Sequence, residues 1–475
     1  MKKAINYNID IENIQSVITK ITGIFPENSF CFSADDFSLD IIFKKQPTTV
    51  DLVLISSSQN TAAIAGNISA ANYSCSENIC RFTIDSIPVQ ITHFYCRKIP
   101  LNPGAKSIQN ILRSEAEKAC ISSRALFILL NGKYAGKLFN PYNKQSILEF
   151  KLIELLEQTP DTISNNPSVV FSAVWDSVNF RLEISQELQE HIKNNAETIS
   201  KIAIESIRDL ILLSLQQVKP SVSIILLYEL GLMDFMFPEI AKLAGVEQLK
   251  EYNHKDVFYH TCEVVDNIAK TTDKLWLRFA ALVHDIAKPR TKRFVEGTGW
   301  TFHGHEEFGA RMMKRIFLRL RFPIEQLEYV KKLVRLHLRP ASLANDIVSD
   351  SAVRRLITEA GDSLDDILIL VRADITSKNP AKVSKVLRNY DRVEAKIRAV
   401  QEKDEIAAFQ SPVRGDEIMQ LCNLKPSKTV GLIKDAIENA ILTNEIENTY
   451  QAAMSYMLKI KDKFISPQAQ VQREQ

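Results

Sequence analysis

The sequence predicts an α+β protein that is mostly α: an α/β head followed by helical domains. Two observations predict this class. Short β-branched or alternating runs are confined to the first 160 residues, and such runs are typical of strands. From about residue 145 onward, apolar residues instead recur every three or four positions, as on the buried face of a helix. Glycine is also scarce, with 14 residues in 475, which favours helices over glycine-rich turns.

The head is predicted from its strands. VDLVLIS (50–56), CRFTID (80–85) and VQITHFY (89–95) are apolar and β-branched, and residues 125–142 are typical of a hairpin that turns at Asn131-Gly132. Composition shifts and proline-containing breaks then predict four regions. These are a head (1–155), a helical middle (156–245), a second helical domain (246–400), and a helical C-terminal segment with a polar tail (401–475).

Composition argues against a membrane or secreted protein. No apolar run approaches the length of a membrane span, and the lysines of the N-terminus MKKAINYNIDIEN are not followed by the apolar stretch of a signal peptide. The seven cysteines are scattered without a close pair. We therefore expect a cytoplasmic protein that has reduced thiols and does not contact a membrane.

Six of the eight histidines lie between residues 254 and 337. His284 and Asp285 end a predicted helix, Asp374 ends another, and His260 lies inside a third. An ionised carboxylate at the end of an apolar helix face is costly unless a cation or several donors meet it. Imidazole and carboxylate groups from three helices suit a divalent metal ion. A single His-Asp pair, however, arises by chance in many proteins as a core or surface feature.

The ordered set is more specific than the pair. His260, the pair within HDIAKP, and Asp374 within RADITSKN together resemble the HD phosphohydrolase superfamily. The resemblance implies four metal ligands, His260, His284, Asp285 and Asp374, for Mn, Fe, Co, Ni, Zn or Mg. It also implies catalytic roles for Asp285, Lys288, His305 and His337, in which a metal-bound water attacks phosphorus. For His305 and His337, a hydrogen-bonded core histidine is an equally good interpretation.

The stretch from Ile286 to Pro340 is basic, with 13 Lys and Arg against 5 Asp and Glu. Such an excess attracts ligands that carry phosphate, although solvated helix faces also explain many of these residues. The predicted RNA or phosphate contacts are Lys288, Arg290, Lys292, Arg293, Arg311, Arg315 and Arg339.

A wider resemblance covers most of the chain. YNHKDVFYHTCEVVDNIA and GWTFHGHEEFGARM look like the HD domain of bacterial tRNA nucleotidyltransferases, the CCA-adding enzymes, which form one class with bacterial poly(A) polymerases. LLYELGLMDFMFPEI (226–240) is similar to the helical body of that family, and residues 419–446 are similar to its C-terminal segment. The resemblance implies a nucleotidyltransferase-like head and RNA, including tRNA, as a partner.

The head departs from the family pattern. In FCFSADDFSLDIIFKKQPTTVDLVLIS, the family's glycine pair corresponds to Asp35 and Asp36, and its first metal-binding Asp to Thr49. Gln90 stands where the family has a third carboxylate. Two family positions match, Asp40 and Asp51. The family's nucleotide-selecting segments correspond to EKACISSRAL and NNPSVVFSAVWDSVNF, where Arg124 alone is kept.

From these departures we expect a head that has lost nucleotidyl transfer, because one carboxylate cannot hold two metal ions. The main hypothesis is then a metal-dependent HD phosphohydrolase acting on a phosphate ester, either a nucleotide or an RNA end. One alternative is an active CCA-adding tRNA nucleotidyltransferase with divergent motifs. The other is a non-catalytic RNA-binding or regulatory protein. The sequence predicts neither the substrate, nor which metal binds, nor the oligomeric state.

Overall fold

The computed structural model describes residues 29–45, 47, 49–57, 74–75, 79–84, 87–96, 99–100, 102–142, 146–156, 166–250, 253–296, 299–344, 349–377, 379–408, 411–443 and 445–465. The N-terminus and the polar tail considered above lie outside these ranges. The chain divides into two compact units, one of residues 1–339 and 362–384 and the other of residues 340–361 and 385–475. The three predicted boundaries between the four regions stay predictions.

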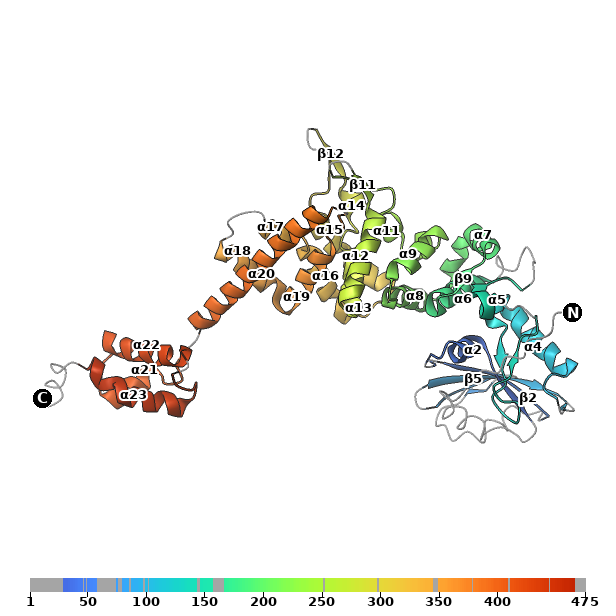
Figure 1. Cartoon of the computed structure of the whole chain (residues 1–475), viewed down its shortest axis with the longest axis horizontal. Coiled ribbons are helices and arrows are strands. Elements are labelled where there is room, and N and C mark those ends of the chain that lie inside the picture. The colour runs from blue at the N-terminus through green and yellow to red at the C-terminus, as the bar shows by residue number, and fades with distance from the viewer. Residues whose placement is uncertain are drawn as a thin grey trace. The chain divides into compact units, whose positions relative to one another are not determined.

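The head is a five-stranded sheet with the order β1-β2-β5-β4-β3, in which β2 and β5 are parallel and the other pairs are antiparallel (Figure 1). Its elements are β1 (Phe30–Ser33), α2 (Asp35–Ile42), β2 (Val50–Ser56), β3 (Ser74–Cys75), β4 (Ile79–Ile84), β5 (Ile87–Tyr95) and α4 (Lys106–Ala119).

Strand β2 is buried on both faces. Leu52 and Leu54 belong to the core that contains Phe37 of α2, whereas Val53 and Ile55 belong to the core on α4. Successive strand residues point to opposite faces of a sheet, and a strand covered by helices on both faces is a continuous apolar run. This explains why VDLVLIS lacks alternation and places Asp51 near the start of the strand.

The strands predicted at 50–56, 80–85 and 89–95 are confirmed as β2, β4 and β5. The predicted hairpin is also present, as β6 (Phe127–Ile128) paired with β7 (Leu138–Phe139). Its connection is wider than the two-residue turn expected at Asn131-Gly132. One cysteine expectation is wrong: Cys80 is disulfide-bonded, whereas Cys31, Cys96, Cys120, Cys262 and Cys422 form no disulfide.

The rest of the first unit is mainly helical, as predicted. Its elements are α5 (Ser146–Phe150), β8 (Leu152–Ile153), α6 (Pro167–Phe180), β9 (Glu183–Ile184), α7 (Gln186–Asn194), α8 (Ile204–Gln216), α9 (Pro220–Glu229), α10 (Met233–Met236), α11 (Pro238–Ala241), β10 (Glu247–Lys250), β11 (Asn253–Asp256), α12 (Val257–Thr271), α13 (Leu275–Val283), α14 (Lys288–Thr291), β12 (Arg293–Val295), β13 (Gly299–Thr301), α15 (His305–Arg319), α16 (Leu327–Leu336) and α19 (Leu364–Ala373).

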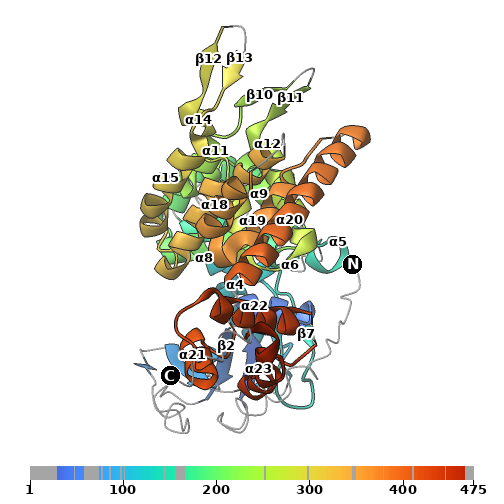
Figure 2. The same cartoon turned by 90° about the vertical axis from the view of Figure 1, so that its left-hand side faces the viewer.

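The hairpins β10–β11 and β12–β13 interrupt this helical pattern. They contact each other and project side by side from the helical body (Figure 2). The periodicity of the sequence did not predict either hairpin, because each strand has only three or four residues.

Helix α13 is fixed by a buried arginine and an aromatic cluster. Arg278 is 3% exposed, and its guanidinium donates to the carbonyls of Leu215, at 2.9 Å, and Thr272, at 3.0 Å. The otherwise unpaired carbonyls near the ends of α8 and α12 are thereby satisfied. Phe279 of α13 packs edge-on against Phe317 of α15, with ring centroids 5.8 Å apart. The end of α13 and the start of α15 therefore have fixed positions.

The second unit contains most of α17 (Arg339–Leu343), α18 (Asp350–Ala360), most of α20 (Pro380–Ala408), α21 (Gly415–Cys422), α22 (Lys428–Leu442) and α23 (Tyr450–Phe464). Arg354 of α18 pairs with Asp404 of α20, and the last three helices share an apolar core that includes Ile433 and Met457. Among the described residues, no helix has the length and hydropathy needed to cross a membrane.

Candidate functional site

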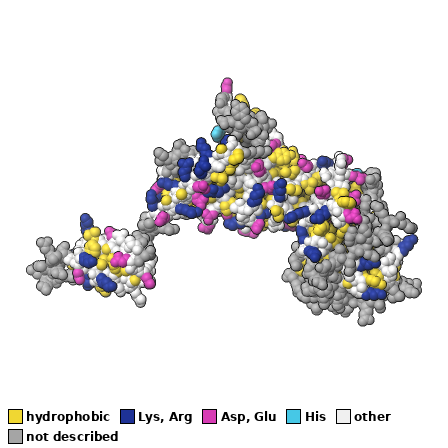
Figure 3. Space-filling model, in the orientation of Figure 1, with side chains coloured by type: hydrophobic (Ala, Val, Ile, Leu, Met, Phe, Trp, Pro, Cys, Tyr) yellow, Lys and Arg dark blue, Asp and Glu magenta, His cyan; other side chains and the backbone are white. Residues whose placement is uncertain are grey.

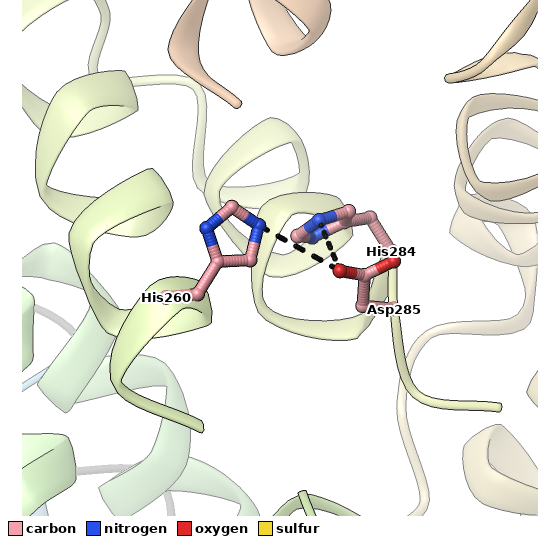
Figure 4. A group of neighbouring side chains, drawn as sticks. All are labelled: His260, His284 and Asp285. Carbon is pink, nitrogen blue, oxygen red and sulfur yellow. Dashed lines mark ion pairs between the residues drawn. The ribbon is translucent and has the colours of Figure 1, made fainter. Parts of the chain in front are cut away.

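Three helices bring the predicted metal ligands together. His260 lies in α12, His284 and Asp285 follow α13, and Asp374 follows α19. The Nε2 atom of His260 is 2.9 Å from Oδ1 of Asp374 and 3.6 Å from Oδ2 of Asp285. The Nε2 atom of His284 is 3.1 Å from Oδ2 of Asp285. Figure 4 shows both rings turned toward the Asp285 carboxylate.

A second group shares Asp285 with the first. His305 begins α15, and its Nε2 is 3.1 Å from Oδ1 of Asp285. His337 follows α16, and its Nε2 is 3.9 Å from the same oxygen. Both sets of three, His260-His284-Asp285 and Asp285-His305-His337, have ligand atoms within 4.8 Å of one another. The two oxygens of Asp285 therefore face different histidine pairs.

The imidazole rings are held by their Nδ1 atoms. In His284, His305 and His337, Nδ1 lies 2.7–2.8 Å from the backbone carbonyl three residues earlier in the chain. A carbonyl only accepts hydrogen bonds, so Nδ1 carries the proton and the neutral ring has its lone pair on Nε2. His260 differs, because its Nδ1 lies 2.8 Å from the hydroxyl of Thr376. Fixing one ring nitrogen so that the other can bind is typical of metal-ligating histidines.

The arrangement requires positive charge between the rings and the carboxylates. Burial by itself lowers the pKa of His284, but Asp285 and then Asp374 outweigh it and raise that pKa to about 10. Burial and the neighbouring His284 lower the pKa of His337 to about 3. Burial raises the pKa of Asp285, yet His284 and Lys288 outweigh it and hold that pKa well below its usual value. A proton on His284, or a metal ion in its place, supplies the missing charge.

The buried polar atoms also fit a metal ion. His284 is 1% exposed, and its Nε2 has no hydrogen-bond partner among the described residues. Leaving such an atom unsatisfied is costly. A divalent ion coordinated by imidazole nitrogen and carboxylate oxygen satisfies it. Asp374, whose side chain is 33% exposed, is the most accessible of the four ligands.

The predicted basic residues do not form one group. Lys288 lies at the centre, with Nζ 2.6 Å from Oδ2 of Asp285. Arg290 lies on α14, Lys292 follows that helix, and Arg293 begins β12. Others contact carboxylates instead: Arg311 pairs with Glu307, and Arg315 pairs with Glu239. Arg339 begins α17.

The head has a cleft of about 570 Å³ at the start of β2, lined by Thr49, Asp51, Ser74, Arg81, Phe82, Thr83, Pro88, Val89 and Gln90. Asp51 carries the only carboxylate among these described residues, and its Oδ2 is 3.4 Å from the Thr49 hydroxyl. Gln90 accepts a hydrogen bond from Arg81 at 2.8 Å. Asp40, the other matching position, is buried in α2 and does not line the cleft.

A second pocket of about 240 Å³ is lined by Asp35, Glu115, Lys118, Arg124, Asn166, Ser168, Val169 and Ser172. Apart from Asp35 and Glu115, these residues come from the two segments that correspond to the family's nucleotide-selecting motifs. Two contacts join the segments: the Arg124 guanidinium binds both carboxylate oxygens of the buried Asp176, at 2.5 and 2.9 Å, and Asn166 donates to the Lys118 carbonyl at 3.2 Å.

Sequence reasoning missed several of these residues. Thr376 has no motif of its own, although it lies two residues after Asp374. The aromatic residues of the hairpin, Phe294 and Trp300, were overlooked beside the lysines and arginines. Their signal was available, because KPRTKRFV and GWTF alternate cations and aromatics with other residues.

Comparison with known proteins gives two family matches within the chain. Residues 257–379 match the HD domain. Residues 181–243 match the probable RNA- and SrmB-binding site of polymerase A.

The relatives in sequence are tRNA nucleotidyltransferases. The chain is 26% identical to the A-adding tRNA nucleotidyltransferase of Deinococcus radiodurans over 326 residues, which is 66% of this chain and 73% of the relative. It is 31% identical to the CC-adding tRNA nucleotidyltransferase of Thermus thermophilus over 247 residues, which is 49% of this chain and 51% of that relative. The match therefore spans about half the length of the second relative.

The fold is shared with a solved enzyme. The CCA-adding enzyme of Thermotoga maritima, in complex with tRNA, matches with a TM-score of 0.53 and 11% identity, covering 95% of this chain and 97% of the other. At this identity the likeness shows the fold alone. The predicted fold class, a sheet-containing head followed by helices, is confirmed.

The main functional hypothesis is wrong. It held that the chain is an HD phosphohydrolase without nucleotidyl transfer, whereas the relatives and structural neighbours are nucleotidyltransferases. The inference relied on missing side chains and overlooked the backbone. Asp35, at a family glycine position, has φ 47°, the left-handed conformation that glycine adopts readily and that Asp tolerates better than most residues.

The intact histidine set was also given too much weight. It identifies an HD domain, and that domain is present, but the relatives in sequence are nucleotidyltransferases rather than phosphohydrolases. The chain therefore contains an HD domain next to a match to the RNA-binding region of polymerase A, and over most of its length it is similar to tRNA nucleotidyltransferases.

Proposed function

We propose that this chain acts at the 3′ end of tRNA as a nucleotidyltransferase with divergent motifs. The observation that carries the proposal is the likeness to A-adding and CC-adding tRNA nucleotidyltransferases, the first of which is matched over 73% of its length. In this reaction the 3′ oxygen of the RNA forms a bond to the α-phosphorus of a nucleoside triphosphate, and pyrophosphate leaves.

The cleft at β2 suits one magnesium ion with a triphosphate. Magnesium is usually held by one or two carboxylates together with substrate phosphates, and it keeps several waters. Asp51 supplies one carboxylate, and the adjacent Thr49 supplies a hydroxyl. The ion, once bound, would offset charge on the phosphates. Asp51 is then the residue in this cleft whose loss weakens the reaction most.

The second pocket suits the nucleoside. Arg124 is held rigidly by the buried Asp176, and Lys118 and Asn166 offer polar groups at the same wall. A site built to hydrogen-bond its ligand rejects analogues that leave the buried groups unpaired. Arg124 and Asn166 are therefore the proposed base-selecting residues, in place of the family's Arg and carboxylate pattern.

The HD centre is proposed as a divalent metal site with the ligands His260, His284, Asp285 and Asp374. Two observations support it: the buried Nε2 of His284 faces the Asp285 carboxylate without a hydrogen bond, and backbone carbonyls fix three of the histidines. His305 and His337 with Asp285 are proposed as a second set of ligands. Since the relatives are transferases, this metal is assigned no hydrolytic reaction here.

Nucleotide addition to tRNA tests the proposal. The full chain is incubated with magnesium, labelled ATP or CTP, and transcripts of one tRNA that lack the last one, two or three nucleotides. We expect extension of at least one transcript. Asp51→Asn should reduce the rate by about a hundredfold or more, the scale of losing a transition-state electrostatic contact, whereas Asp209→Asn, an exposed carboxylate on α8, should not change it.

The outcome of the assay is decisive in both directions. If no transcript is extended with either nucleotide, the proposed activity is wrong. If extension occurs but is equal in wild type and Asp51→Asn, the chemistry lies outside the β2 cleft. The transcript that is extended identifies which nucleotide the chain adds.

A further inference from the structure

The segment between Asp285 and α15 carries three cations that each lie over an aromatic ring: Lys288 over Phe302 at 5.7 Å, Arg290 over Phe308 at 5.9 Å, and Lys292 over Trp300 at 4.6 Å. The cations occupy alternate positions along α14 and the residue that follows it. The rings belong to β13, to the residue that follows β13, and to the start of α15. We call this set, with Phe294, the cation–aromatic ladder.

The outer end of the ladder is exposed. Phe294 of β12 and Trp300 of β13 are paired directly across the hairpin, with ring centroids 5.3 Å apart. Their side chains nevertheless remain 63% and 39% exposed. A two-stranded hairpin has no core of its own to bury such rings. Exposed apolar groups that cluster in this way are typical of a binding surface.

The charge of the ladder is not neutralised within the protein. Residues 288–303 contain four cations, Lys288, Arg290, Lys292 and Arg293, against one carboxylate, Glu296. Of these cations, Lys288 pairs with Asp285, and no carboxylate of the described residues pairs with the other three. Elsewhere on the body, Lys and Arg side chains alternate with Asp and Glu over the face shown in Figure 3. The ladder is therefore a local site for an anion.

The inner end of the ladder is the HD centre itself, since Lys288 contacts Asp285 at 2.6 Å. A ligand bound along the ladder therefore has one end at the proposed metal ligands. Interleaved cations and aromatic rings suit single-stranded nucleic acid, because rings stack on bases while cations contact the phosphates between them. A protein partner does not require cations at alternate positions.

We propose that the cation–aromatic ladder binds single-stranded RNA and leads its end toward the HD centre. Trp300 and Phe294 stack on bases, and Arg290, Lys292 and Arg293 contact phosphates. That this RNA is the 3′ end of tRNA rests on the proposed function. Binding by the ladder itself does not, since it requires only an unpaired strand.

A short fluorescein-labelled oligoadenylate, with no duplex part, is the probe for the ladder. Its anisotropy is titrated with the full chain and with four variants. Trp300→Ala and Phe294→Ala should each weaken binding by about tenfold, the effect of removing one stacking ring. Trp300→Phe keeps a ring and should bind nearly as well as wild type. Phe235→Ala is the matched control, because Phe235 is 45% exposed on α10, away from the ladder.

Tryptophan fluorescence gives a second measurement in the same titration. Of the three tryptophans, Trp300 is exposed, whereas Trp175 and Trp276 are half-buried. Stacking of a base on Trp300 should therefore quench emission in wild type, and Trp300→Phe should bind RNA without that quenching. Binding should also fall steeply with salt, because phosphate contacts release counterions.

The proposal for the ladder is refuted if oligoadenylate does not bind. It is also refuted if Trp300→Ala, shown by circular dichroism to be folded, binds as tightly as wild type. The second result is also the one expected if the hairpin serves a protein partner. Nucleotide addition by the same preparations shows which of the two proposals is wrong, RNA binding by the ladder or nucleotidyl transfer by the chain. Addition that persists while the ladder variants bind RNA normally refutes the ladder alone. Loss of oligoadenylate binding in Trp300→Ala, with no addition by wild type, refutes the proposed function alone.

Discussion

The head cleft and the HD centre differ in what each has kept. In the HD centre every side chain of the predicted ligand set is present, and three helices hold the set in place. The head keeps its sheet order, a cleft at Asp51 and the left-handed backbone at Asp35, while most of its metal-binding side chains have changed. A complete set of residues identifies a domain, but it does not reveal which reaction the whole chain performs.

The largest effect that would sharpen this comparison is expected from Asp285→Asn. Asp285 faces both histidine pairs, so its loss should lower the affinity for metal more than the loss of a residue that only orients a ligand. Losing an orienting residue typically costs up to about a hundredfold in affinity, and we expect a larger loss for Asp285→Asn. Metal analysis of the purified variant measures this. Asp365→Asn, an exposed carboxylate on α19, should retain the wild-type metal content. Equal metal content in Asp285→Asn and wild type would show that the centre binds no ion through this carboxylate.

A smaller effect is expected from Thr376→Val. The hydroxyl of Thr376 fixes Nδ1 of His260 at 2.8 Å, and losing such an orienting partner typically costs about 10- to 100-fold in metal affinity. Thr376→Ser keeps the hydroxyl and should restore most of the affinity. Competition with a metal-binding dye measures both variants. If Thr376→Ser binds metal as weakly as Thr376→Val, the methyl group matters and the hydroxyl does not.

The smallest effect concerns packing near the centre. A Cβ at Gly309 would lie 3.1 Å from Val334 and 3.5 Å from Ile286, so Gly309→Ala crowds α15 against α16 and the segment after Asp285. At Gly431 of α22 nothing lies within 4 Å, so Gly431→Ala should stabilise its unit by up to about 1 kcal/mol through helix propensity. Thermal unfolding measures the stability of both variants, and we expect Gly309→Ala to lower it because of the crowding. A gain in stability for Gly309→Ala would show that α15 shifts freely.

Much of the HD centre was predictable from periodicity. Apolar faces at Leu277, Ala280 and Ala281, and at Ile367, Leu370 and Val371, place His284 and Asp374 at the ends of buried helices, and the structure has both residues there. The predicted strands of the head also follow from local composition. These features depend on residues close together in the chain.

Features that depend on distant residues were not predictable. Thr376 meets His260 across 116 residues, and Arg124 meets Asp176 across 52. Nothing in the local pattern of either segment indicates its partner. The backbone at Asp35 was invisible for another reason, because a left-handed φ at a non-glycine residue leaves no compositional signal. The wrong functional hypothesis rested instead on the missing carboxylates, of which Asp51 alone remains among the described residues of the cleft.

The rate of nucleotide addition in two matched variants tests the central claim most directly. Wild type, Asp51→Asn and Asp285→Asn are assayed with tRNA lacking its 3′ end, labelled ATP or CTP, and excess magnesium. If the head performs the transfer, wild type extends the tRNA, Asp51→Asn loses about a hundredfold or more of the rate, and Asp285→Asn stays close to wild type. No extension by wild type, or a loss in Asp285→Asn as large as that in Asp51→Asn, would contradict the account.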